Sequence, residues 1–158
     1  MNQASLSTDI RRDLVALLPR LRRFALTLTG NAPEADALVR EVADRAIQKS
    51  HHWKGEDRLE NWLFSMMRSR ADEARKRKRV DPDAADSGNA PGNHNSSNAL
   101  LSMPEGFASA LLLADVEGFT YAEGAAILSI PTDQFVARLC AARLKLSSVG
   151  TATSERRA

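Results

Sequence analysis

A basic segment near the middle of the chain is the part of the sequence best suited to chemistry. Residues 68–79, RSRADEARKRKR, contain seven Lys or Arg and two acidic residues. Cations gathered on one helical face neutralise phosphates, and the nearby Trp62 and Phe64 add aromatic surfaces on which unstacked bases can lie. The alternative for such a segment is a solvated basic helix end, and Trp62 on an apolar stripe is more typical of a core residue. Single-stranded nucleic acid is therefore one predicted ligand.

Metal binding and catalysis are not expected. Of the three histidines, His51 and His52 are adjacent and would point in different directions on a helix, while His94 lies in a polar segment. The single cysteine, Cys140, is expected to be a small half-buried side chain of a helix. The sequence contains no glycine-rich phosphate loop, nucleophile elbow or paired carboxylates. We therefore predict a protein without enzymatic activity, metal or cofactor.

Length and composition limit the class of protein. The 158 residues suffice for one domain or two small ones, with 43% hydrophobic and 27% charged residues. No apolar run approaches the ~20 residues that a membrane span requires, so membrane insertion is not expected. One cysteine cannot form an internal disulfide, and residues 1–13 lack the apolar stretch of a signal peptide. We predict a cytoplasmic location.

The formal charge of +2 conceals two halves of opposite sign. Residues 1–80 hold 17 Lys and Arg against 11 Asp and Glu, a net of +6, while residues 81–158 hold 5 against 9, a net of −4. Such asymmetry indicates nucleic acid or a charged partner. Between them, 14 of the 19 residues in 81–99 are Asp, Pro, Ser, Gly or Asn, and none is a large hydrophobe. This composition is typical of a flexible linker.

Hydrophobic spacing predicts three helices before the linker. The first spans about residues 9–29; Gly30 and Asn31 suit its end, and Pro33 suits the first turn of the second helix. A polar loop over residues 51–57 precedes a third helix over about 59–79. Its predicted apolar stripe comprises Trp62, Leu63, Met66, Met67, Arg70 and Ala74.

The second module has the parts of a helix-turn-helix. An apolar stretch from Phe107 leads to a turn at Gly118, and Thr120 to Glu123 reads as a capping box that starts a helix ending near Leu128. A last helix is predicted from Thr132 to about Leu146, with an apolar stripe of Phe135, Leu139, Ala142 and Leu146. Because nothing alternates with period two, we predict an all-α fold. The predicted parts are a first module (1–80), a linker (81–103), a second module (104–150) and a tail (151–158).

Both modules carry the motifs of one family. LLPRLRRFALTLTGNAPEADALVREVADRAIQ followed by NWLFSMMRSRADEARKRKR resembles region 2 of the extracytoplasmic-function (ECF) sigma factors of bacterial RNA polymerase. The family patterns "D-x-L-V-Q-E" and "W-L-x-x-I-x-R-N-x-x-x-D-x-x-R" are matched by Asp36, Leu38, Val39, Glu41, Trp62, Leu63, Arg68, Asp72 and Arg75. MPEGFASALLLADVEGFTYAEGAAILSIP resembles region 4 of the same family, in the same order along the chain.

The resemblance implies a sigma factor that directs core RNA polymerase to stress-response promoters, under the control of an anti-sigma factor. Region 2 would dock on the β′ coiled coil and capture the minus-ten element, with an extruded base held by the loop 51–61. The implied core-binding residues are Asp36, Leu38, Val39, Arg40 and Glu41. The implied DNA-binding residues of region 2 are Trp53, Lys54, Arg58, Asn61, Trp62, Arg68, Arg70, Arg75, Lys76 and Lys78.

Region 4 would bind the β flap and read the minus-thirty-five element of the promoter. Its implied DNA-binding residues are Thr132, Asp133, Gln134, Arg138 and Arg143. The sequence departs from the family pattern where Val136, Ala137 and Ala141 replace a basic residue, a Ser and an Arg. Because each cation that pairs with a phosphate adds affinity for any sequence, these replacements are expected to weaken binding and to reduce its salt dependence.

Two other functions stay open on these residues. The scarcity of cations in the second module is compatible with a sigma-like interaction module that binds an anti-sigma factor or core polymerase with little promoter recognition. A plain helix-turn-helix repressor explains the second module but gives the first no role.

Overall fold

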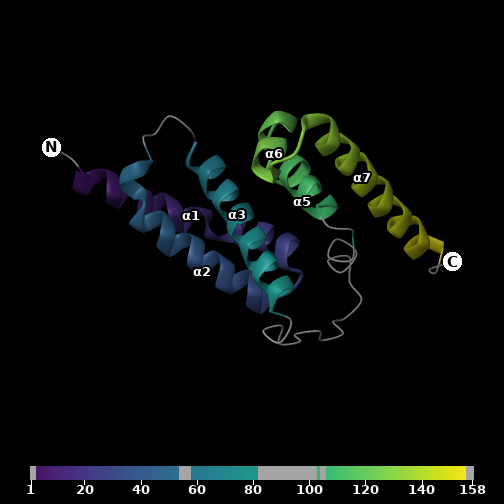
Figure 1. The fold of residues 1–158 in the computed structure, drawn as a ribbon. Coiled ribbons are helices and arrows are strands. Elements are labelled where there is room, and N and C mark those ends of the chain that lie inside the picture. The colour runs from purple at the N-terminus through teal and green to yellow at the C-terminus, as the bar shows by residue number, and fades with distance from the viewer. Residues whose placement is uncertain (1–2, 54–57, 82–102, 104–105, 156–158) are drawn as a thin grey trace. The chain divides into compact units, whose positions relative to one another are not determined.

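Every element of the structure is helical in the part of the chain that it describes, residues 3–53, 58–81, 103 and 106–155 (Figure 1). The coordinates are those of a computed structural model. The absence of strands from these ranges confirms the predicted all-α class. The chain divides into two units, Met1–Ser87 and Gly88–Ala158, and each is described by itself. The predicted linker lies outside the described residues except for Asp81 and Met103.

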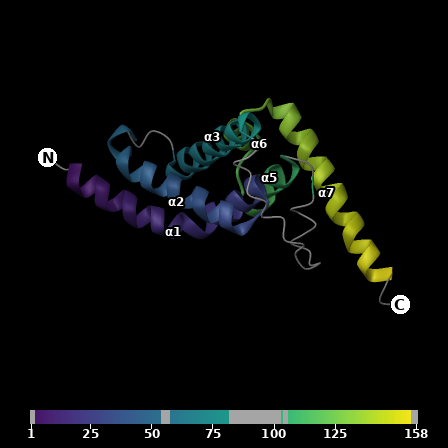
Figure 2. The ribbon, with the colours of Figure 1, turned by 60° about the horizontal axis from the view of Figure 1, so that its bottom comes forward.

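In its described residues, the first unit contains three helices, with a short 3-10 turn, η1 (Ser50–His52), after the second. They are α1 (Gln3–Thr29), α2 (Ala32–Gln48) and α3 (Leu59–Val80). Figures 1 and 2 show α1 and α2 side by side, with α3 packed on both. The prediction that the first helix starts near residue 9 was wrong, because the polar residues before that point gave no apolar period to mark it.

The turn between α1 and α2 follows from its residue types. Gly30 has a φ of 80°, the left-handed conformation that commonly ends a helix. The side chain of Asn31 accepts a hydrogen bond from the backbone N–H of Glu34 at 2.9 Å and so caps α2. Pro33 occupies the first turn of α2, where no backbone donor is needed. The chain therefore reverses direction within two residues.

The buried face of α3 differs from the predicted stripe. Phe64 is fully buried, with its ring centroid 5.0 Å from that of Phe24 on α1, so it belongs to the core rather than to a surface for bases. Trp62 and Met66 are only half-buried and Ala74 is exposed. The prediction was right for Leu63 and Met67 and wrong for the rest of the stripe. The buried residues of α3 are Leu59, Leu63, Phe64, Met67 and Ala71.

Helices of unequal length form the second unit. They are α5 (Phe107–Leu111), its π-helical continuation η3 (Leu112–Val116), α6 (Tyr121–Leu128) and α7 (Thr132–Glu155). The bounds of α6 and its capping box confirm the prediction: the Thr120 hydroxyl accepts from the Glu123 backbone N–H at 3.2 Å, and the Thr120 N–H donates to the Glu123 carboxylate at 2.9 Å.

The last helix, α7, is longer than predicted. It continues to Glu155 instead of ending near Leu146, and Figure 2 shows it running beyond α5 and α6. Residues 143–148 are all exposed, so Leu146, 38% exposed, does not continue the predicted apolar stripe. The expectation that Cys140 is half-buried was also wrong, because its side chain is exposed.

A glycine allows α6 and α7 to approach closely. A Cβ atom at Gly124 would lie 2.5 Å from Cζ of Phe135, whose ring is fully buried. The chain turns between the two helices at Ser129, which has a φ of 55°. Close packing at this point sets the angle between α6 and α7.

Within the described ranges, no helix combines the length and the apolar character that crossing a membrane requires.

Candidate nucleic-acid interface

The basic residues of α3 divide into two groups by what they contact. Arg68 pairs with Asp72 at 2.5 Å, and Arg70 pairs with Glu41 and Glu73. Lys78 pairs with Glu34 at 2.5 Å. By contrast, Lys76 and Arg79 are exposed on the last turns of the helix and take part in no ion pair found among the described residues. Arg77 is also exposed, with Glu73 at 3.9 Å. The predicted phosphate-binding set is thus largely engaged within the unit, and the exposed set includes two arginines that the prediction left out.

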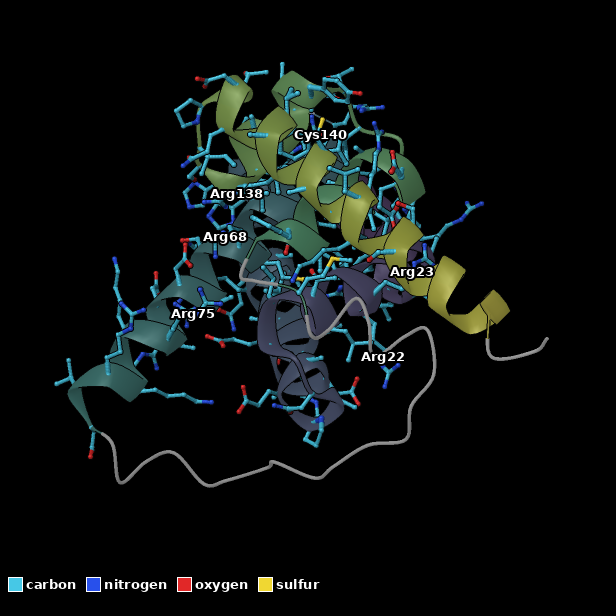
Figure 3. The ribbon with its side chains drawn as sticks, turned by 90° about the vertical axis from the view of Figure 1, so that its right-hand side faces the viewer. Arg22, Arg23, Arg68, Arg75, Arg138 and Cys140 are labelled. Atoms are coloured by element: carbon cyan, nitrogen blue, oxygen red, sulfur yellow. The ribbon has the colours of Figure 1, made fainter. Side chains whose placement is uncertain are left out.

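Arg75 has a structural contact of its own. Its Nη2 donates to the backbone carbonyl of Leu28 at 3.1 Å, which satisfies a carbonyl at the end of α1. Its Nη1 lies 3.8 Å from Asp72. Burial lowers the pKa of the Arg75 guanidinium, and the positive charge of Arg68 lowers it further. Figure 3 shows Arg68 and Arg75 projecting from the same helix.

The predicted core-binding residues on α2 have unequal access to a partner. Asp36, Arg40 and Glu41 are exposed and Val39 is half-buried. Leu38 is 6% exposed, so its side chain is part of the helical core and shapes this face only from beneath. The Asp36 carboxylate accepts from Nε of Arg22 on α1 at 2.7 Å, an ion pair that raises the pKa of Arg22.

The residues predicted to hold an extruded base differ in burial. Trp53, Asn61 and Trp62 are half-buried and Arg58 is exposed, while Lys54 lies outside the described residues. Oδ1 of Asn61 is buried and has no hydrogen-bond partner among the described residues. A buried acceptor without a partner costs about 1–3 kcal/mol, so a donor supplied by a ligand would be favoured here.

The N-terminal turn of α7 is open to solvent in the second unit. Thr132, Asp133 and Gln134 are all exposed, as the reading of base edges requires. Asp133 lies in the first turn, where a carboxylate complements the helix dipole. These three predicted contacts are therefore accessible to DNA.

The two arginines of α7 that match the family pattern differ in what they contact. Arg143 makes a bidentate pair with Asp115, with distances of 2.9 Å from Nε and 2.5 Å from Nη2. Its hydrogen bond lowers the pKa of the Asp115 carboxyl, while Asp115 and Tyr121 raise the pKa of Arg143. Arg138 is half-buried, and its guanidinium lies beside the backbone of Gly106.

Sequence reasoning missed the intramolecular partners of these cations, although part of the signal was present. Asp72 and Glu73 stand three or four residues from Arg68, Arg70 and Arg77, the spacing at which side chains meet on one helix. The partners on α2 could not be read from local spacing. Nor did local spacing indicate that Arg20 joins α1 to Glu60 of α3, at 2.7 Å.

Comparison with known proteins matches these two units to one family. The family description "Sigma2 domain of PhyR" matches residues 14–68, within the first unit. The chain is 34% identical over 157 residues to the ECF RNA polymerase sigma factor EcfG of Rhodopseudomonas palustris (strain TIE-1). That alignment covers 91% of this chain and 86% of the relative.

Two solved structures share the fold. The sigma factor RpoE of Bartonella quintana, solved in complex with the anti-sigma factor NepR, superposes with a TM-score of 0.75 at 26% identity, over 90% of this chain and 97% of that one. CnrH, solved in complex with the cytosolic domain of CnrY, superposes with a TM-score of 0.62 over 93% and 96% of the two chains. At 19% identity the second match shows the fold alone.

The likeness to an ECF factor extends over nine-tenths of the chain and so includes the helix-turn-helix with its reduced positive charge. An interaction module without promoter recognition is therefore not favoured, and a simple repressor would leave the sigma2 match unexplained. The exposed cations at the end of α3 and the open first turn of α7 suit such a role. With both units accounted for, the chain belongs to the ECF family of RNA polymerase sigma factors, which initiate transcription as a subunit of the polymerase.

Proposed function

We propose that the first unit binds core RNA polymerase through α2 and holds the single-stranded minus-ten element at α3. The carrying observation is the likeness to an ECF factor over 91% of the chain. The exposed residues Asp36, Arg40 and Glu41 supply the contacts to the β′ coiled coil, with Val39 at their edge. Leu38 supports this face from the core.

The start of α3 forms the site for a base extruded from the nontemplate strand. Asn61 offers a buried acceptor to an exocyclic amine, and Trp53 and Trp62 offer aromatic surfaces. Lys54 and Arg58 contribute positive charge beside the same site. Unstacking a base costs a few kcal/mol, which these contacts offset.

Phosphates of the melted strand are bound by the cations of α3. Lys76 is fully available, and Arg77 and Arg79 extend the exposed group. Arg68, Arg70, Arg75 and Lys78 contribute once their intramolecular partners are exchanged for phosphate.

The second unit contacts the β flap and the duplex minus-thirty-five element. Base edges face Thr132, Asp133 and Gln134 at the start of α7, and Asp133 can accept from a cytosine amine. Arg138 and Arg143 orient the helix or contact phosphates. With few free cations, this unit adds less to affinity than the first.

Regulation by a protein partner is suggested by the structural relatives. RpoE and CnrH were both solved with a bound protein, for RpoE an anti-sigma factor. We infer that an anti-sigma factor also binds this chain and hides its polymerase-facing surfaces. The chain acts in the cytoplasm, on stress-response promoters, as a regulator without catalysis or cofactor.

Run-off transcription with purified core RNA polymerase tests the function. The full chain is expected to direct transcription from a cognate promoter and to form open complexes. Lys76→Ala with Arg79→Ala should reduce open complex at least several-fold, because two exposed phosphate-binding cations are removed. Arg11→Ala with Arg12→Ala, two exposed arginines of α1, is the matched control and should retain activity. Core binding without transcription from any promoter, in a genome-wide run-off assay, would refute the proposal.

A further inference from the structure

Acidic residues of α2 neutralise cations of α3 across a groove of about 500 Å³ between the two helices. Glu34 binds Lys78 at 2.5 Å, and Glu41 binds Arg70. Both carboxylates and Lys78 line the groove, together with the apolar side chains of Ala71 and Ala74. Two ion pairs thus connect α2 with the basic end of α3.

The pair between Glu41 and Arg70 joins two functional surfaces. Glu41 belongs to the face of α2 proposed to dock on core polymerase, and Arg70 belongs to the cations proposed to bind phosphates. The Arg70 side chain is 13% exposed and also pairs with Glu73, so its charge is already balanced within the unit. Carboxylate and phosphate compete for a guanidinium because both accept its bidentate hydrogen bonds.

We propose that Glu41, together with Glu34, withholds Arg70 and Lys78 from nucleic acid until core polymerase engages α2. Contact of the polymerase with the Glu41 carboxylate removes it from Arg70, which then binds a phosphate of the melted strand. The free chain therefore binds single strands weakly, and the holoenzyme binds them tightly. Because coupling between two ligands is reciprocal, the bound strand also strengthens core docking. This inference rests on the function proposed above.

The first experiment measures binding of the free full-length chain to a fluorescent single-stranded 20-mer by anisotropy. Glu41→Gln is expected to tighten binding about threefold to tenfold at low salt, since it removes one of the two carboxylates that pair with Arg70 and leaves Glu73 for a phosphate to displace. Each released cation should steepen the salt dependence by about 0.7 for a single strand. Glu34→Gln tests Lys78 independently in the same way.

Asp44→Asn is the matched control. Asp44 is exposed on the same helix and takes part in none of the ion pairs found among the described residues, and its substitution changes the net charge by the same amount. If Glu41→Gln and Asp44→Asn shift the affinity equally, the effect is one of overall charge and the proposal fails.

Two further measurements complete the test. Arg70→Gln with Glu41→Gln should return the affinity of the free chain to that of the wild type, and a retained gain would contradict the role of Arg70. The affinity for the single strand is also measured with saturating core polymerase and divided by the affinity of the free chain. This ratio should be smaller for Glu41→Gln than for the wild type. An unchanged ratio overturns the coupling. Failure of the proposed function would show separately, as wild-type holoenzyme without transcription.

Discussion

At the scale of single residues, the environment of a cation decides its role more than its type does. Lys76 and Arg143 are both exposed on basic helices, yet Lys76 has no ion-pair partner in the described ranges and Arg143 is held by both oxygens of Asp115. A solvent-exposed pair contributes little stability but still fixes where the guanidinium lies. Counting arginines therefore overstates the number of groups available to DNA.

The pair between Asp115 and Arg143 should give the second unit a pH dependence. The folded pKa of Asp115 lies below its ordinary value of 3.8, so the pair stabilises the fold fully above that pH and ceases to do so as the pH falls through the folded pKa. Thermal melts of the wild type and Arg143→Gln should differ by a constant amount between pH 5 and 8 and converge in stronger acid. A difference that persists at pH 2 would exclude this origin.

A methyl group at Gly124 should destabilise the helix-turn-helix. Alanine favours a helix by about 1 kcal/mol over glycine, but its Cβ would lie 2.5 Å from the Phe135 ring. Overpacking costs about 1–3 kcal/mol, so Gly124→Ala is expected to lower the free energy of unfolding by a net of up to about 2 kcal/mol. Urea unfolding followed by circular dichroism measures it.

The double variant Gly124→Ala with Phe135→Leu is the control for this mechanism. Leucine leaves room for the new methyl group, so the two substitutions should cost less together than the sum of their separate effects. If the two losses in free energy of unfolding simply add, the new methyl group does not clash with the Phe135 ring.

At the scale of elements, the helix α6 depends on its first turn. Its eight residues are too few for a stable isolated helix, so the reciprocal hydrogen bonds of Thr120 and Glu123 matter. Thr120→Ala should lower the free energy of unfolding by about 1 kcal/mol, whereas Thr120→Ser should preserve it. Equal stability of Thr120→Ala and the wild type in urea would show that packing alone holds this helix.

The same local chemistry explains which elements could be predicted from the sequence. The bounds of α6 depend on neighbouring residues, from the capping box at Thr120 to the turn at Ser129, and the prediction was right. The core face of α3 depends on where α1 packs, through contacts such as Phe24 with Phe64, so spacing within the helix did not identify it. Likewise, α7 continues to Glu155, beyond the apolar pattern from which its end was predicted near Leu146.

The candidate site shows the same limit. Its cations were visible in the sequence as residues 68–79, but their partners lie 29 residues away for Arg70 and Glu41 and 44 for Lys78 and Glu34. Ion pairs between residues so far apart in the sequence form only when α2 and α3 pack together. The assignments of individual residues to polymerase or DNA stay predictions.

At the scale of the whole molecule, positive charge is concentrated in one half. The first 80 residues carry a net +6 and the remainder −4, and within the negative half Arg143 is paired with Asp115. Affinity for promoter DNA should therefore come mainly from the first unit, with the second adding selectivity.

Adding charge to the recognition helix tests this division. Val136 is half-buried at the position where the family pattern has a basic residue, and a lysine there can extend its ammonium group to solvent. Val136→Lys should tighten duplex binding and steepen its salt dependence by about 0.9, as one added phosphate contact predicts. Val136→Met, of similar length but uncharged, should leave the slope unchanged, and an equal slope for both variants would remove phosphate contact as the cause.

The backbone at Gly106 ties the start of α5 to α7. Gly106 has a φ of 85° and precedes α5, and a Cβ there would lie 2.4 Å from Nη1 of Arg138 on α7. Two independent constraints, the left-handed backbone and the neighbouring guanidinium, therefore restrict this position to glycine. Any larger residue at position 106 would have to displace the Arg138 side chain, so a substitution outside α7 would change the surface that α7 presents.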